Sequence, residues 1–113
     1  YPVFADHMMA LYSRRRETIG KAIEAGIDVY SGTDAGTVVP HGEILSEVAE
    51  LASLGGGEFA IKASSWGARS WLGVDALVEG ASADLIVTTA DPRADTGALR
   101  DPLARLLRGR LIS

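Results

Sequence analysis

The first half of the chain carries apolar positions at helical spacing. Tyr12, Ile19 and Ile23 are separated by seven and then four residues, which places them on one face of a helix. We predict this helix over Leu11–Ala25, and Gly26 supplies its end. The residues before it show no clear period and are expected to form only a lead-in.

Two further helices are predicted downstream. Apolar positions recur at helical spacing over Glu43–Leu54, and the triplet Gly55–Gly57 breaks that helix. A third helix is predicted over Glu58–Leu72, with Gly73 as its end. The two tryptophans of this helix are expected to lie in the core.

Three segments favour strands. Ile27–Ser31 is rich in β-prone residues and follows a helix and a glycine, which is the αβ half of a βαβ repeat. Ala83–Thr89 is the densest β-branched run, and Leu106–Ile112 is predicted as a last strand with a turn or bulge at Arg108–Arg110. We expect all three to pair with strands from outside the chain, because a parallel strand needs neighbours and two strands alone are marginal.

The loop after the first of these segments is the candidate for chemistry. Gly32–Gly42 is longer than the two to six residues common in α/β connections. Long loops at the carboxyl ends of parallel strands are where such folds keep their functional residues. This loop carries Asp34 and His41.

Each of these two residues has a functional and a structural interpretation. Asp34 could offer a hard oxygen ligand to a divalent cation, or it could simply cap a turn. His41 could bind substrate or move protons near neutral pH, or it could be a surface histidine. The residues alone leave both choices open.

Composition narrows the classes of function. The 113 residues fit one domain, and 47% apolar against 23% charged residues indicates a folded protein with a core. A net charge of −4 and a pI near 5.0 give no electrostatic reason to expect nucleic acid or a membrane as partner.

Other features bear on location and processing. Because cysteine is absent, disulfides and thiolate metal sites are excluded, which suits a cytoplasmic protein. No apolar run approaches the roughly 18 residues of a spanning helix, so we expect a soluble, untargeted chain. The sequence begins at Tyr1 without methionine, and we therefore expect a fragment or a processed product.

Several segments, taken in order, resemble motifs of one enzyme family. Gly26–Glu43 is similar to the last barrel strand of the metal-dependent amidohydrolase superfamily, most of all to its imidazolonepropionase-like and dipeptidase-like branch. Ala60–Gly73 resembles that family's helix E-A-[LI]-x-A-A-T-x-x-A-A-x-x-L-G, with Ser65 where threonine is usual. Three more segments resemble its G-x-x-A-D-L-V-V strand, its D-P pair and its closing V-x-x-G-x segment; they are Gly80–Val87, Asp91–Pro92 and Leu107–Arg110.

The resemblance implies an α/β fold. Residues 1–74 would be the carboxyl-terminal end of a (β/α)8 TIM barrel, with its last strand and flanking helices. Residues 75–113 would be strands of the small β-sandwich that flanks such a barrel.

The resemblance also implies roles for single residues. Asp34 matches the aspartate that binds the metal and acts as general base on the hydrolytic water, and His41 matches a histidine that contacts substrate. The cofactor would be a divalent metal, zinc being the first choice, as one or two ions. The family's other ligands, a His-x-His, a carboxylated lysine or a glutamate, and two strand histidines, have no counterpart here.

We therefore expect the carboxyl-terminal part of a metal-dependent hydrolase that cleaves C–N bonds of cyclic amides or dipeptide-like substrates. The expected partners are a small-molecule substrate and the remainder of the parent barrel, with homo-oligomers left open. This chain alone would be inactive. The alternative is a non-catalytic amidohydrolase-like subunit or binding module.

Overall fold

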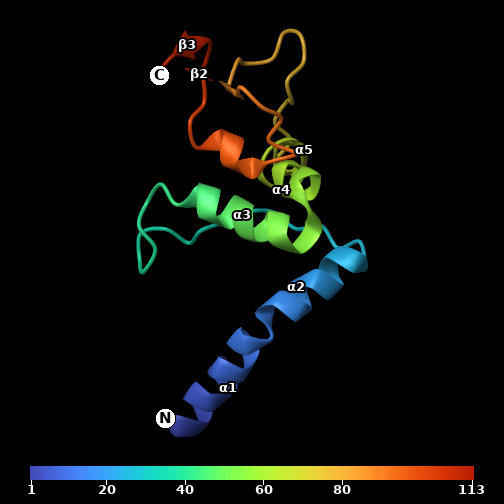
Figure 1. Cartoon of the computed structure of the whole chain (residues 1–113), viewed down its shortest axis with the longest axis vertical. Coiled ribbons are helices and arrows are strands. Elements are labelled where there is room, and N and C mark those ends of the chain that lie inside the picture. The colour runs from blue at the N-terminus through green and yellow to red at the C-terminus, as the bar shows by residue number, and fades with distance from the viewer.

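The computed structural model describes all residues, 1–113. Its elements, in chain order, are α1 (Pro2–Ser13), α2 (Arg15–Glu24), α3 (Ile44–Gly55), α4 (Gly57–Ser64), α5 (Trp66–Trp71), β1 (Leu85–Val87), the 3-10 helix η1 (Thr96–Leu99), β2 (Ala104–Leu107) and β3 (Arg110–Leu111). The helices come first and a three-stranded antiparallel sheet follows (Figure 1). The structure thus confirms that the chain contains both helices and strands, as expected for the α/β class.

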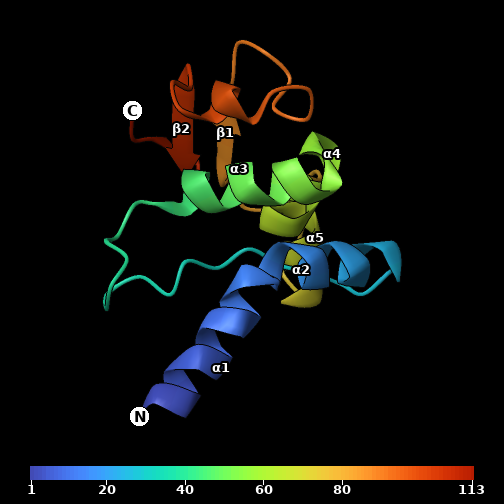
Figure 2. The same ribbon diagram turned by 60° about the horizontal axis from the view of Figure 1, so that its bottom comes forward.

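The amino-terminal residues form a helix rather than a lead-in, so that expectation is wrong. Pro2 occupies the first position of α1, where its missing N–H costs no hydrogen bond. The single helix predicted over Leu11–Ala25 is divided at Arg14, which has φ −96° and ψ 0°. In Figures 1 and 2, α1 extends away from the other elements, and none of its residues is buried.

The core lies where α3 and α4 meet. Its five buried side chains are Val48, Leu51, Ala60, Ile61 and Ala63. Val29 and Leu99 pack against this cluster from segments far apart in the sequence. The core is small, and each of its fully buried Val, Leu or Ile side chains stabilises the fold by only about 1.5–3 kcal/mol.

The glycine triplet breaks the chain between α3 and α4, as predicted. Gly56 has φ +90°, a conformation that favours glycine. A Cβ atom on Gly57 would lie only 2.1 Å from the carbonyl oxygen of Arg93. Gly57 therefore allows the start of α4 to touch the turn that follows β1.

The helix predicted over Glu58–Leu72 is interrupted at Ser65, where φ is −136° and ψ is −103°. The result is two short helices, α4 and α5, and Gly73 ends the second with φ +70°. Trp66 is 39% exposed and Trp71 is 68% exposed, so the expectation that both tryptophans lie in the core is wrong.

Ile27–Ser31 is not a strand, which corrects the prediction. A strand is defined by its neighbours, and this segment has none in the chain. Its two backbone hydrogen bonds run from the Ile27 N–H to the Ala22 carbonyl of α2, at 3.0 Å, and from the Ser31 N–H to the Ala63 carbonyl of α4, at 3.3 Å. These β-prone residues therefore form an irregular segment beside α4 and pair with no strand.

The carboxyl-terminal strands pair with one another in the order β1-β2-β3, and pairing of the outer edges of β1 and β3 with strands outside the chain stays a prediction. β1 is shorter than the predicted Ala83–Thr89 and pairs antiparallel with β2, Ile86 opposite Arg105. The segment predicted as a last strand over Leu106–Ile112 lies in a hairpin of β2 and β3, and the turn of that hairpin falls within the predicted Arg108–Arg110. Its two turn residues, Arg108 and Gly109, have φ values of +50° and +74°, as a tight hairpin turn requires.

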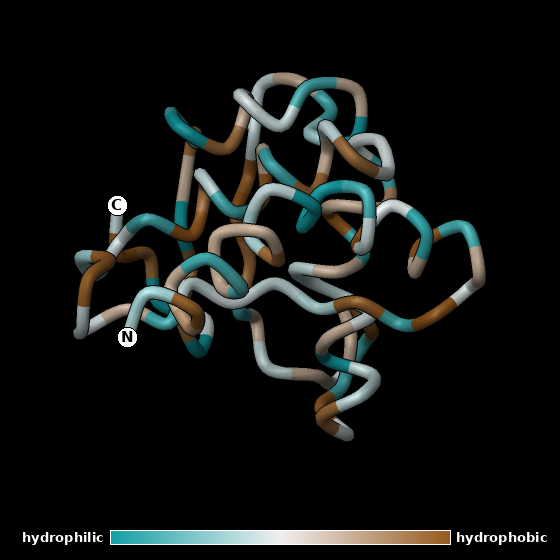
Figure 3. The backbone as a smooth tube through the Cα atoms, turned by 90° about the horizontal axis from the view of Figure 1, so that it is seen from below, coloured by the Kyte–Doolittle hydropathy of each residue, from teal (hydrophilic) through white to brown (hydrophobic).

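The chain exposes more surface than its mass predicts. Its accessible area is 8420 Å², whereas a compact domain of this mass exposes about 6,000 Å². Its radius of gyration is 16.5 Å, against about 13 Å for a compact domain of this length. In Figure 3 hydrophobic stretches of the backbone, coloured brown, lie at the outer edge of the molecule as well as near its centre. No helix combines the length and apolar character needed to cross a bilayer.

Candidate functional site

Asp34 has an unusual backbone conformation. Its φ is +51°, and Arg108 is the one other non-glycine residue with positive φ. Aspartate tolerates the left-handed region better than most residues, because its short polar side chain can bond locally. Such conformations gather at functional sites, where surrounding structure must hold them.

Short contacts close the loop that carries Asp34. The Gly36 N–H donates to the Val39 carbonyl at 3.0 Å, and Ala35 and Val39 form an isolated bridge. The Thr37 hydroxyl donates to the Asp34 carbonyl at 3.4 Å. These bonds turn the chain back on itself directly after Asp34.

His41 folds back over the same loop. Its Nε2 atom lies 3.5 Å from the position that a Cβ atom would take on Gly36, which has φ +107°. No hydrogen bond or ion pair joins the imidazole to the Asp34 carboxylate. The structure therefore brings the two predicted site residues onto one compact loop, without a direct bond between their side chains.

The Asp34 carboxylate is exposed, and no hydrogen bond or ion pair within the chain engages it. Such a group is free to accept a proton or a cation. No three His, Asp or Glu side chains converge to hold a metal, whereas zinc sites use three or four protein ligands. The residues present therefore fit a divalent cation only as part of a ligand set completed from outside the chain.

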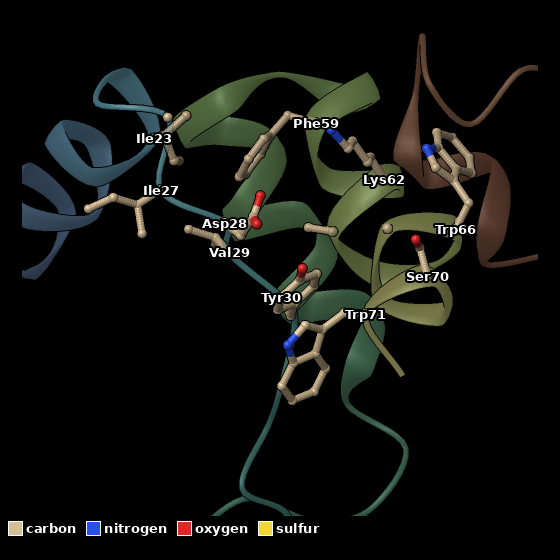
Figure 4. A pocket seen from close by; sticks show the side chains of 13 residues that line it. Ile23, Ile27, Asp28, Val29, Tyr30, Phe59, Lys62, Trp66, Ser70 and Trp71 are labelled. Carbon is tan, nitrogen blue, oxygen red and sulfur yellow. The ribbon is translucent and has the colours of Figure 1, made fainter. Parts of the chain in front are cut away.

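The sequence did not point to a pocket formed by the segment that precedes this loop. A cavity of about 550 Å³ lies between residues 26–30 and the helices α4 and α5. Figure 4 shows Tyr30 stacked on Trp71, and their ring centroids are 5.2 Å apart with planes inclined by 26°. Asp28 and Lys62 supply the charged groups of its lining, and Asp34 is not part of it. The aromatic residues on either side of Gly32–Gly42 were visible in the sequence, but their contact joins residues 41 positions apart.

Asp84 joins the helices to the sheet. Its Oδ1 atom accepts the Arg108 backbone N–H at 2.7 Å, and its Oδ2 atom lies 3.9 Å from Arg69 of α5. The hydrogen bond from Arg108 lowers the pKa of Asp84, with help from Ser82 and Arg69. Arg69 also donates to the Asp75 carbonyl at 3.0 Å. These contacts fix the hairpin turn on the end of α5, which is a structural task.

A similar pair stabilises the turn after β1. The Arg93 guanidinium donates to both Asp91 carboxylate oxygens, at 2.8 to 3.1 Å. This contact lowers the pKa of Asp91 and raises that of Arg93. The pair shapes the turn that reaches Gly57 and leaves no free acid there.

The chain has similar counterparts in mycobacteria. No family model matches it. Proteins titled as uncharacterized, from Mycobacterium bovis and from the CDC 1551 and H37Rv strains of Mycobacterium tuberculosis, are each 46% identical to it over 111 residues. The match covers 97% of this chain and 30% of each relative. The chain thus spans about 30% of the length of the curated relatives that it matches.

Proposed function

We propose that the chain is the carboxyl-terminal part of a metal-dependent amidohydrolase, built on a TIM barrel and cleaving C–N bonds in cyclic amides or dipeptide-like compounds. The observation that carries the proposal is Asp34, an unpaired carboxylate with a left-handed backbone in the loop after an apolar segment. The resemblance of the ordered motifs to that superfamily supports it. The greater length of the mycobacterial relatives is compatible with further ligands elsewhere.

Under this proposal Asp34 has two tasks. One carboxylate oxygen would contribute to the binding of a divalent cation, zinc being the first choice. A bound ion of that kind polarises a carbonyl and makes water more acidic. Asp34 would take the proton from the hydrolytic water and deliver it to the leaving nitrogen, a role that typically contributes 10²–10⁴-fold to the rate.

His41 would hold substrate at the edge of the loop. Its imidazole rests on Gly36, so ring and loop form one surface. A ring in that place can donate a hydrogen bond to a substrate oxygen or accept one from an amide. We assign it to substrate binding rather than to the metal.

The second candidate is a non-catalytic subunit of the same type. The observation that favours it is the absence of any three converging ligand side chains within the chain. In that case Asp34 would serve only the turn that Gly36 and Val39 close.

The test needs the chain in a full-length context. We define the full-length chimera as the H37Rv relative with these residues in place of its matching segment. Zinc content is measured by elemental analysis, and hydrolysis is assayed on a panel of cyclic amides and dipeptides. The proposal predicts bound zinc and turnover in the parent chimera, and loss of at least about 100-fold of that turnover in Asp34→Asn.

His41→Ala is the companion variant. This variant should raise KM by about tenfold, because one hydrogen bond to substrate is lost. Its zinc content should stay unchanged. A folded chimera that binds no zinc and hydrolyses nothing would favour the non-catalytic subunit. Unchanged zinc and turnover in Asp34→Asn would remove this residue from the mechanism.

A further inference from the structure

The pocket between residues 26–30 and the helices α4 and α5 is formed by this chain alone. Its lining comes from α2, from the segment that follows α2, and from α4 and α5. Its volume of about 550 Å³ falls within the range of small-molecule sites, about 300–1,000 Å³. Neither Asp34 nor His41 lines it. The pocket is therefore separate from the loop to which the proposed function assigns the chemistry.

Two charged side chains of opposite sign line this pocket without a partner. The Asp28 carboxylate and the Lys62 amine are exposed, and neither makes a hydrogen bond or an ion pair within the chain. Figure 4 shows both groups on the side of the pocket where the Phe59 ring lies. A ligand with a single charge would be attracted by one of the two groups and repelled by the other. The pair therefore favours a ligand that carries one positive and one negative group.

Aromatic rings form much of the remaining lining. Trp71 stacks on Tyr30 with ring centroids 5.2 Å apart, yet Trp71 is still 68% exposed. Phe59 adds a half-buried ring from α4. Aromatic rings attract one another in offset-stacked and edge-to-face arrangements. The open indole of Trp71 therefore suits a planar ring of a ligand.

Small residues border the pocket on α4 and α5. A Cβ atom on Gly67 would lie 2.8 Å from the Lys62 carbonyl oxygen, so glycine allows α5 to start close to α4. Ala63 and Ser70 are further small residues of the lining. The Ser70 hydroxyl makes no hydrogen bond within the chain, and a hydroxyl can donate to a ligand oxygen or accept from a ligand N–H. Polar groups of this kind fix the orientation of a ligand in a pocket.

We propose that this pocket binds a small zwitterion that carries an aromatic ring, which is the chemistry of a free aromatic α-amino acid. The ligand carboxylate would pair with Lys62, its ammonium group with Asp28, and its ring would pack on the indole of Trp71. Because both charged side chains are exposed, each ion pair is weak. For a ligand of this size we expect a Kd on the order of 1 mM.

A series of ligands tests the proposal on the unaltered 113-residue chain. L-Phenylalanine is titrated while the indole N–H of Trp71 and the amide of Lys62 are followed by two-dimensional NMR, and both signals should show saturable shifts. Phenethylamine lacks the carboxylate, 3-phenylpropionate lacks the ammonium group, and L-alanine lacks the ring. Each should bind at least about fivefold more weakly than L-phenylalanine. The absence of saturable shifts, or equal affinity for any of the three analogues, would overturn the proposal.

Two variants test the charged groups one at a time. Lys62→Met removes the charge and keeps an unbranched side chain, so L-phenylalanine should bind at least about threefold more weakly while phenethylamine loses no affinity. Asp28→Asn should weaken L-phenylalanine to a similar extent and leave 3-phenylpropionate no weaker. Asp101→Asn is the matched control, because Asp101 is also exposed and lies outside the pocket. Unchanged affinity in Lys62→Met, or equal losses in the two aspartate variants, would contradict the assignment.

This inference does not rest on the proposed function. Asp34→Asn should leave the affinity for L-phenylalanine unchanged, because Asp34 does not line the pocket, whereas the same variant should lose turnover in the full-length chimera. Binding of L-phenylalanine by the chain without turnover by the chimera would overturn the hydrolase proposal alone. Turnover by the chimera without binding of L-phenylalanine by the chain would overturn the pocket proposal alone.

Discussion

Residues 26–42 hold seven Ile, Val, Tyr and Thr residues and the longer stretch 84–111 holds five, yet only the second stretch forms strands. In the second region every strand has a neighbour, and Leu85 lies opposite Leu106. In the first region residues 28–30 have no backbone partner at all. A β-prone segment of this chain therefore forms a strand only where a partner segment lies nearby in the sequence.

The same contrast holds for the two aspartates that follow or precede these segments. Asp84 is engaged by the Arg108 N–H and lies near Arg69, and its pKa is lowered as a result. Asp34 is exposed and engaged by nothing in the chain. A carboxylate tied into the fold serves stability, whereas a free one is available for chemistry.

The largest expected effect separates these two carboxylates. In the full-length chimera, Asp34→Asn should lower turnover at least about 100-fold and leave the melting temperature of the zinc-free protein unchanged. Asp84→Asn should do the opposite, lowering the melting temperature while turnover per folded molecule stays constant. Assays and thermal melts of both variants check this, and equal effects of the two would break the distinction.

The next effect concerns the contact that joins the sheet region to the helical core. Gly57→Ala places a Cβ 2.1 Å from the Arg93 carbonyl oxygen, so backbone must move. We expect a loss of about 1–3 kcal/mol in the free energy of unfolding, the usual cost of overpacking. Urea titration measures it. Gly20→Ala is the control, because nothing lies within 4 Å of its Cβ position, and a stability loss as large there would refute the contact.

Sequence patterns predicted the local parts of the fold and missed the non-local ones. Helix α3 and the break at Gly55–Gly57 were predicted because period and glycine act within a few residues. The prediction of a strand at Ile27–Ser31 was wrong, because strand pairing depends on segments that lie far away in the sequence. The interruption between α4 and α5 at Ser65 is not marked by any pattern in the sequence.

The candidate site was predicted in part. Asp34 and His41 were singled out, and the structure puts them on one loop. The stack of Tyr30 on Trp71 was missed, because it joins residues that only tertiary packing brings together. Their roles in metal and substrate binding stay predictions.

A smaller effect is the pH dependence of the sheet region. The pKa of Asp84 in the folded state lies below its ordinary value of 3.8, so its carboxylate stabilises the fold above that pH. The contribution is lost as pH falls below 3.8 through the folded-state value. Thermal melts between pH 5 and about pH 2 should fall less steeply in Asp84→Asn, with the remaining slope including Asp91, whose pKa is lowered too.

The smallest effect is a gain. Arg108 has φ +50° next to Gly109 in the hairpin turn, and Asn-Gly is the pair that such turns prefer. Arg108→Asn should raise the free energy of unfolding by about 0.5 kcal/mol, since the backbone N–H still reaches Asp84. Urea titration checks this, and a loss of stability would show that the arginine side chain matters more than the turn.

Residues 28–30 have no backbone partner within the chain, whereas each strand between residues 85 and 111 has one. Amide exchange in the 113-residue chain tests it most directly. We predict slow exchange at Leu103 and Arg105, which donate to carbonyls at 2.8 Å, and exchange near the unfolded rate at Asp28 and Tyr30. Protection of Asp28 and Tyr30 equal to that of the sheet would contradict the account.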